Sequence, residues 1–91
     1  MTDTSRGADY EKKIRELAEG VEGVETVDVV HSRMFGNKVY IDLEIEVDRN
    51  KTVGEGHAIA DRVHDLLENS FSEVKHVMVH VNPTPENKPE D

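Results

Sequence analysis

Residues 39–48 read Val-Tyr-Ile-Asp-Leu-Glu-Ile-Glu-Val-Asp, with apolar and polar side chains in strict alternation. A period of two is typical of a β-strand that has one face on a core and the other on water or a partner. Residues 24–35 are rich in β-branched side chains, and Gly36-Asn37 separates the two runs. These features predict an antiparallel hairpin of two strands.

A helix is predicted before the hairpin. Asp9 is its expected N-cap, apolar side chains recur at helical spacing after it, and Gly20 and Gly23 are expected to end it. Residues 1–8 are polar and aperiodic, so we expect them to form a flexible lead.

A second helix and a third strand are predicted after the hairpin. Thr52 with Glu55 three residues later forms a capping box, which is typical of a helix start. Apolar residues alternate over residues 76–82, and Pro83 is expected to stop this strand. Residues 84–91 are rich in proline and charge and are predicted to be a disordered acidic tail.

The predicted order of elements is therefore helix, strand, strand, helix, strand. Two helices are enough to cover one face of a small sheet. The sequence thus predicts an α+β fold, a two-layer sandwich with a three-stranded sheet and one open face. A chain of 91 residues has room for one such domain, which we place at residues 9–83.

Composition narrows the classes of function. Twenty acidic against eleven basic residues give a net charge of -9, which argues against binding to nucleic acid or to an anionic membrane surface. The chain has no cysteine, so nitrogen and oxygen would have to hold any metal ion. No apolar run approaches the roughly 18 residues of a membrane span, so we expect no direct membrane insertion. The sequence has no glycine-rich phosphate loop, nucleophile elbow or zinc-protease motif, and it therefore indicates no enzyme.

Polar side chains gather on the face of the predicted sheet that the helices leave open. These are Asp42, Glu44 and Glu46 on the second strand and His76, His80 and Asn82 on the third. Asp28 joins them if Val27 and Val29 face the helices. Neighbouring strands lie about 4.7–4.9 Å apart, so their carboxylates and imidazoles can converge on one ion. Such donors suit zinc and, with more oxygen, manganese, iron(II) or cobalt. Plain solvated surface is the alternative interpretation of each residue.

Two other histidines give weaker signals. His57 lies in the first turns of the second predicted helix and by itself is interpreted as a surface residue. His31 is expected on the same face as Val27 and Val29, as a tolerated edge residue of the first strand.

Four segments, taken together and in this order, resemble the C-terminal cytoplasmic domain of cation diffusion facilitator transporters. They are Gly23-Val24-Glu25, residues 33–48, residues 56–63 and Val79-His80-Val81-Asn82-Pro83. The resemblance implies a metallochaperone-like, ferredoxin-like form of the predicted sandwich, on the cytoplasmic side of the membrane. It also implies a homodimer, attached to the transmembrane domain of a parent transporter that exports Zn²⁺ or related ions. Metal bound at the dimer interface would regulate transport.

The resemblance also implies a set of metal ligands. The family's usual ligand positions correspond here to Asp28, Glu44, His57, His80 and Asn82. The implied ion is a divalent metal, first of all Zn²⁺, with Mn²⁺, Fe²⁺, Co²⁺ and Cd²⁺ as further candidates. Asp28 and Glu44 stand where histidines are frequent in the family, and Asn82 stands where a carboxylate is frequent. The two carboxylates make the site harder, which leaves a preference for Mn²⁺ or Fe²⁺ open.

Two other functions remain open at this point. In the first, the same sandwich dimerises through its open face or an edge without metal, and its histidines and carboxylates are solvated. The second is a small-ligand-binding regulatory domain of the same fold class. That function calls for a glycine-lined loop between the first strand and a helix, and the sequence shows none.

Overall fold

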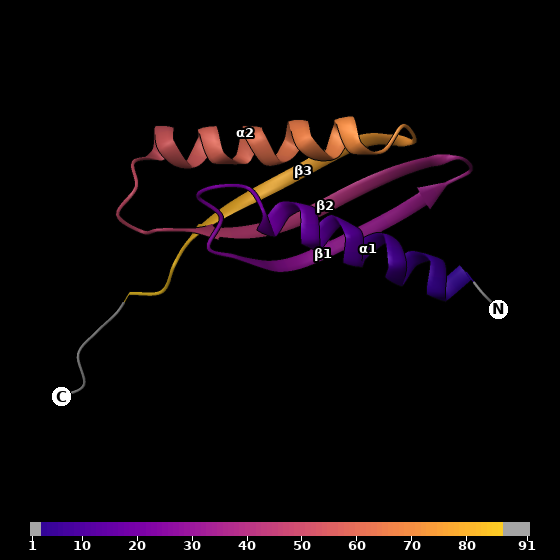
Figure 1. The fold of residues 1–91 in the computed structure, drawn as a ribbon, viewed down its shortest axis with the longest axis horizontal. Coiled ribbons are helices and arrows are strands. Elements are labelled where there is room, and N and C mark those ends of the chain that lie inside the picture. Colours follow the sequence, from indigo (N-terminus) through magenta and orange to yellow (C-terminus); the bar gives the residue numbers. More distant parts are fainter. Residues whose placement is uncertain (1–2, 87–91) are drawn as a thin grey trace.

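A computed structural model of the protein describes residues 3–86, with side chains from residue 9 onward. The elements are α1 (Asp3–Glu19), β1 (Thr26–Phe35), β2 (Lys38–Val47), α2 (Val53–Ser70) and β3 (Val74–Pro83). The predicted order of helices and strands is confirmed. Figure 1 shows the turn between β1 and β2 at one end of the molecule, and the β2–α2 loop at the other. We call these the hairpin end and the far end.

Helix α1 begins earlier than predicted. It starts at Asp3, so Asp9 is not its N-cap, and residues 3–8, which were expected to form a flexible lead, are helical. A helix that is already nucleated gains one hydrogen bond for each residue added, and residues 3–8 contain no proline that would stop it. Residues 1–2 of the predicted lead and 87–91 of the predicted tail lie outside the described residues.

The three strands form one sheet in the order β1-β2-β3. β1 runs antiparallel to β2, as the predicted hairpin requires, and β3 runs parallel to β2. A parallel pair needs a crossover connection, which α2 supplies. Beyond Pro83, Thr84 extends the pairing by donating its backbone N–H to the carbonyl of Val47 at 2.9 Å.

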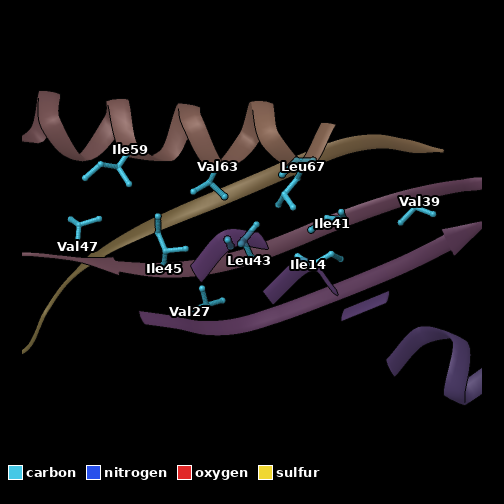
Figure 2. Close-up of a cluster of buried hydrophobic side chains, with 12 residues drawn as sticks. Ile14, Val27, Val39, Ile41, Leu43, Ile45, Val47, Ile59, Val63 and Leu67 are labelled. Atoms are coloured by element: carbon cyan, nitrogen blue, oxygen red, sulfur yellow. The ribbon is translucent and has the colours of Figure 1, made fainter. Parts of the chain in front are cut away.

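Both helices pack on the same face of this sheet. Every second residue of β2, from Val39 to Val47, is buried. Ile14 of α1 and Ile59 and Leu67 of α2 join these residues in one hydrophobic cluster (Figure 2). The alternation that predicted the strand therefore builds the core, and the opposite face of the sheet stays open.

Helix α2 begins as predicted. Thr52 is the N-cap, and its Oγ1 accepts a hydrogen bond from the backbone N–H of Glu55 at 3.0 Å. In return, the backbone N–H of Thr52 donates to Glu55 Oε1 at 2.9 Å. This reciprocal pair satisfies N–H groups that the start of a helix otherwise leaves without partners.

β1 contains a bulge that the alternation did not predict. Val27 lies opposite Ile45, but Val29 lies opposite Glu44, so Asp28 is an extra residue in the ladder. Val27 is 5% exposed on the core face, whereas Val29 is 44% exposed on the open face. The expectation that these two valines share a face is wrong, because a bulge inserts one residue and reverses the alternation beyond it.

Side chains of α1 cover the free edge of β1. Glu11 Oε2 accepts hydrogen bonds from the backbone N–H and the hydroxyl of Ser32, both at 3.2 Å. Arg15 Nη1 donates to the carbonyl of Val27, next to the bulge. These bonds occupy backbone groups that an edge strand otherwise presents to other chains.

Candidate functional site

The open face is the side of the sheet that is turned away from both helices. Its residues follow from the pairing register of the strands, except Asp28, which has no partner in the register and is placed on this face by its contact with Glu46. They are Asp28, Val29, His31, Arg33 and Phe35 of β1, Lys38, Tyr40, Asp42, Glu44 and Glu46 of β2, and His76, Met78, His80 and Asn82 of β3. Along the register, Glu44 and Glu46 lie in the half of β2 toward the far end, whereas Phe35, Lys38 and Tyr40 lie near the β1–β2 turn.

A depression of about 230 Å³ lies on this face. It is lined by His31 and Asp42, which are opposite each other on β1 and β2, and by Glu44 and His80, which are opposite each other on β2 and β3. Two of the predicted ligands, Glu44 and His80, are therefore direct neighbours, and the depression adds a second histidine and a second carboxylate beside them.

The sequence analysis placed Asp42 on the open face with Glu44 and His80, but it did not place His31 there. The bulge lies between Val27 and Val29, so Val29 and His31 lie on the open face while Val27 lies on the core face. The position of Asp42 opposite His31 depends on the pairing register. No local pattern in the sequence marks the bulge, so no signal could have placed His31 beside Glu44.

Asn82 also contacts the predicted ligand Glu44. Its Nδ2 donates to Glu44 Oε1 at 3.2 Å, in a half-buried contact between β3 and β2. The contact is diagonal, because Glu44 lies opposite His80 and Asn82 lies opposite Glu46. The structure thus brings Glu44, His80 and Asn82 together on two adjacent strands.

Asp28 lies farther along the open face, beside Glu46. Thr26 Oγ1 donates to Asp28 Oδ1 at 3.2 Å. Partial burial, and then the neighbouring Asp28 carboxyl, raise the pKa of Glu46 above its ordinary value, while a hydrogen bond with Thr26 opposes part of the shift. Two neighbouring carboxyl groups disfavour their joint ionisation, and a cation between them would relieve this repulsion.

His57 lies on the other side of the sheet. It belongs to α2 near the far end, and its Nε2 is 3.6 Å from Asp61 Oδ2 on the exposed surface of the helix. The residue also lines an apolar pocket of about 300 Å³ that includes Val53 and Val81. His80 faces the opposite side of β3 from Val81, so one copy of the chain does not bring His57 to the other predicted ligands.

The described part of one chain holds no preformed metal site. Among its residues, no group of three or more histidine, aspartate or glutamate side chains stands in an arrangement that could hold a metal ion. By their chemistry, the carboxylates of Asp28 and Glu44 and the imidazole of His80 suit a first-row divalent ion.

The hairpin end of the open face is aromatic. Phe35 is 58% exposed and meets Tyr40 edge to face, with ring centres 5.3 Å apart. The ring of His76 lies 6.2 Å from that of Tyr40. Exposed apolar groups that gather on an uncovered sheet face are typical of a surface that meets a partner.

No helix within residues 3–86 is both long enough and apolar enough to cross a membrane.

Comparison with known proteins identifies the family. The model of the family described as "Cation efflux protein, cytoplasmic domain" matches residues 7–84. The chain is 41% identical over 63 residues to the uncharacterized transporter YdbO of Bacillus subtilis (strain 168), and the aligned residues cover 69% of this chain and 21% of that protein. It is 32% identical over 60 residues to the manganese efflux system protein MneP of the same organism, and here the aligned residues cover 66% of this chain and 20% of that protein. The chain therefore spans about a fifth of the length of these curated relatives.

Solved structures confirm the ferredoxin-like fold. A variant of MamM CTD superposes with a TM-score of 0.85 at 25% sequence identity, covering 89% of this chain and 99% of that one. The family match runs from within α1 to just past the end of β3, so it includes the whole sheet and both helices that cover it. The chain belongs to the family of cation efflux protein cytoplasmic domains.

Proposed function

We propose that this domain is the metal-sensing and dimerisation domain of a divalent-cation efflux transporter, and that a metal ion binds between two copies of it. The position of His57 is the observation that carries this proposal. It lies on the other side of the sheet from Glu44 and His80, yet it is near the start of α2 and lines a pocket with Val47 and Val81, close along the strands to Glu44 and His80. A second copy that packs against this end can bring its own His57 toward the His80 of the first.

Apolar side chains around His57 support a second copy at the far end. Val53 is 91% exposed and Val81 is 37% exposed, and both line the pocket that His57 also lines. A two-fold dimer would bury the same patch on both copies. Burial of these valines would stabilise an interface that also contains the proposed ligands.

Because both copies are negatively charged, a bound metal ion would control how strongly they associate. Each copy carries a net charge of -9, so two copies repel each other. Asp28, Glu44 and Glu46 concentrate negative charge on the far half of the open face. A bound dication would offset part of this repulsion. The concentration of free ion on the cytoplasmic side would therefore set how closely two copies approach, and in the parent transporter this would regulate transport.

The donor set favours a first-row divalent ion. Zn²⁺ is the ion expected from the family resemblance, and it accepts imidazole and carboxylate together. The larger share of oxygen in this chain favours Mn²⁺, and one relative is named a manganese efflux protein. We therefore propose that both ions bind, and that a competition titration ranks them.

Scattering and calorimetry test the proposal. Adding Mn²⁺ or Zn²⁺ at neutral pH is expected to give binding heat and a compact dimer, and EDTA is expected to reverse both. His57→Ala and His80→Ala are expected to abolish binding, whereas the matched control His64→Ala on α2 keeps it. Protons compete with the ion for the ligand imidazoles, so binding is expected to weaken as pH falls. A wild-type chain that neither binds nor compacts with either ion overturns the proposal.

A metal-independent dimerisation module is the second candidate. It is favoured by the lack of a preformed metal-holding group in the described part of one chain and by the exposure of Phe35 and Val53. Such a domain would form the same dimer in EDTA. His57→Ala and His80→Ala would then leave the dimer unchanged.

A further inference from the structure

Asn82 occupies a position at which the family resemblance implies a ligand, but its contact in this structure is with another side chain. Its Nδ2 donates to Glu44 Oε1 at 3.2 Å. The contact joins residues 38 positions apart in the sequence and is partly buried. It is the one side-chain hydrogen bond recorded for Glu44 among the described residues.

The chemistry of the amide explains this partner. A side-chain amide carries two N–H donors on its nitrogen and one acceptor oxygen, whereas an ionised carboxylate only accepts. With the donor end turned to Glu44, the amide nitrogen holds one carboxylate oxygen. An amide binds a metal ion through its oxygen and not through this nitrogen, so the contact shows a link to Glu44 and does not show whether Asn82 also binds the ion. An aspartate at this position would place a second negative charge beside Glu44 and lose the bond at neutral pH.

We propose that Asn82 acts on metal binding as a positioning residue for Glu44. This inference rests on the proposed function. Asn82 holds Oε1 of Glu44, and Oε2 is left without a hydrogen-bond donor among the described residues. Glu44 would then offer a single oxygen, beside the imidazole of His80 on the adjacent strand.

A single-oxygen carboxylate also bears on which ion binds. Ca²⁺ takes six to eight oxygens and often takes a carboxylate through both of its oxygens, whereas Zn²⁺ takes about four donors. By tying up Oε1, Asn82 would disfavour Ca²⁺ at this position. Asn82→Ala is expected to lower the preference for Zn²⁺ over Ca²⁺.

A double-mutant cycle tests the positioning role. Mn²⁺ binding is measured by calorimetry on the full chain for wild type, Asn82→Ala, Glu44→Ala and the double variant. Asn82→Ala is expected to weaken binding roughly 10- to 100-fold, the range for residues that orient a ligand. In the Glu44→Ala background, where Asn82 has no carboxylate to hold, the same change is expected to have no further effect, because Asn82 acts through Glu44. Additive losses would show that Asn82 is an independent ligand, and unchanged binding in Asn82→Ala would show that it has no role. Either result overturns the inference.

A metal-free measurement separates this inference from the proposed function. If the wild-type chain binds no Mn²⁺, the proposed function fails, but the contact is still tested by NMR of side-chain amides in EDTA. At one fixed pH, the Asn82 amide signals are expected to move in Glu44→Ala, because this change removes the oxygen that accepts from Asn82 Nδ2. The amide of Asn69 on α2 serves as control. Asn82 signals that stay unchanged in Glu44→Ala overturn the inference even if metal binds.

Discussion

At Gly23 the backbone has a φ of 100°, a conformation that residues with a side chain rarely adopt. A Cβ at this position would lie 2.6 Å from Ile59 Cδ1 in the core. Gly23→Ala is therefore expected to lower the free energy of unfolding by about 2–4 kcal/mol, because backbone strain adds to overpacking. Urea denaturation measures the loss. Gly36→Ala is the control, since its φ is 63° but no atom lies within 4 Å. Equal losses in the two variants would show that the contact with Ile59 is unimportant.

Glu46 makes stability depend on pH. Its pKa is raised in the folded chain by partial burial and by Asp28, so folding favours the protonated form. The resulting stability is fully present below the unfolded value of about 4.3 and is lost as pH rises through the raised value. Glu46→Gln is therefore expected to be at least as stable as wild type at pH 7, and its advantage is expected to vanish near pH 3–4.

Urea midpoints at both pH values check this expectation. Glu25→Gln removes the same formal charge from an exposed residue just before β1 and controls for net charge. If both variants gain equally at pH 7, the effect belongs to the overall charge of the chain and not to the contact with Asp28.

Single residues also show where prediction from sequence ends. The types of side chain at Glu44, His80 and Asn82 indicated a shared polar face, because alternation along each strand is a local property. The sequence did not show that Asn82 bonds to Glu44. That contact depends on the diagonal register between β2 and β3, which are joined by a whole helix.

At the scale of elements, the start of α2 offers a direct test. Thr52→Ala removes the side chain that accepts from Glu55 N at 3.0 Å. The variant is expected to lose about 0.5–2 kcal/mol of unfolding free energy, the usual range for an N-cap. Thr52→Ser is expected to restore the loss, since serine caps equally well. Thermal or urea unfolding followed by circular dichroism measures both variants.

Ser70→Ala at the other end of α2 is the matched control. The Ser70 hydroxyl donates to the carbonyl of Leu66 at 2.7 Å within the helix, a type of bond that adds little to helix stability. A change within about 0.5 kcal/mol is expected for it. If Ser70→Ala costs as much as Thr52→Ala, the capping box does not account for the loss.

The elements that could be predicted are those with local causes. The alternation in β2 and the capping box of α2 each lie within a few residues and were confirmed. The start of α1 and the bulge at Asp28 were not predicted. A polar segment without proline, such as residues 3–8, can either extend a helix or stay outside it. The extra residue in β1 does not change the composition of the strand, so composition could not reveal the bulge. The bulge changed which face His31 occupies, and so the candidate site was predicted less completely than the fold.

For the whole molecule, the two-layer arrangement could be predicted from the number of elements, because two helices cover one face of a three-stranded sheet and leave the other open. The way in which two copies pair cannot be predicted from the elements of one chain. His57 and His80 lie on different sides of one chain, and only the pairing of copies decides whether they share an ion. Neither the sequence nor the structure of one chain gives the relation between two copies, and an experiment on mixed dimers tests it.

Mixing two inactive variants distinguishes a shared site from a site within one chain. If each site takes His57 from one copy and His80 from the other, homodimers of His57→Ala or of His80→Ala have no complete site. A mixed dimer of the two variants has one complete site, because the His57→Ala chain supplies His80 and the His80→Ala chain supplies His57. Calorimetry with Mn²⁺ and with Zn²⁺ on the separate and mixed variants is therefore expected to show binding only after mixing. If the site were built within one chain, mixing would not restore binding, because every chain in the mixture lacks either His57 or His80. Binding that stays absent in the mixture, while the wild-type dimer binds, would rule out the shared site.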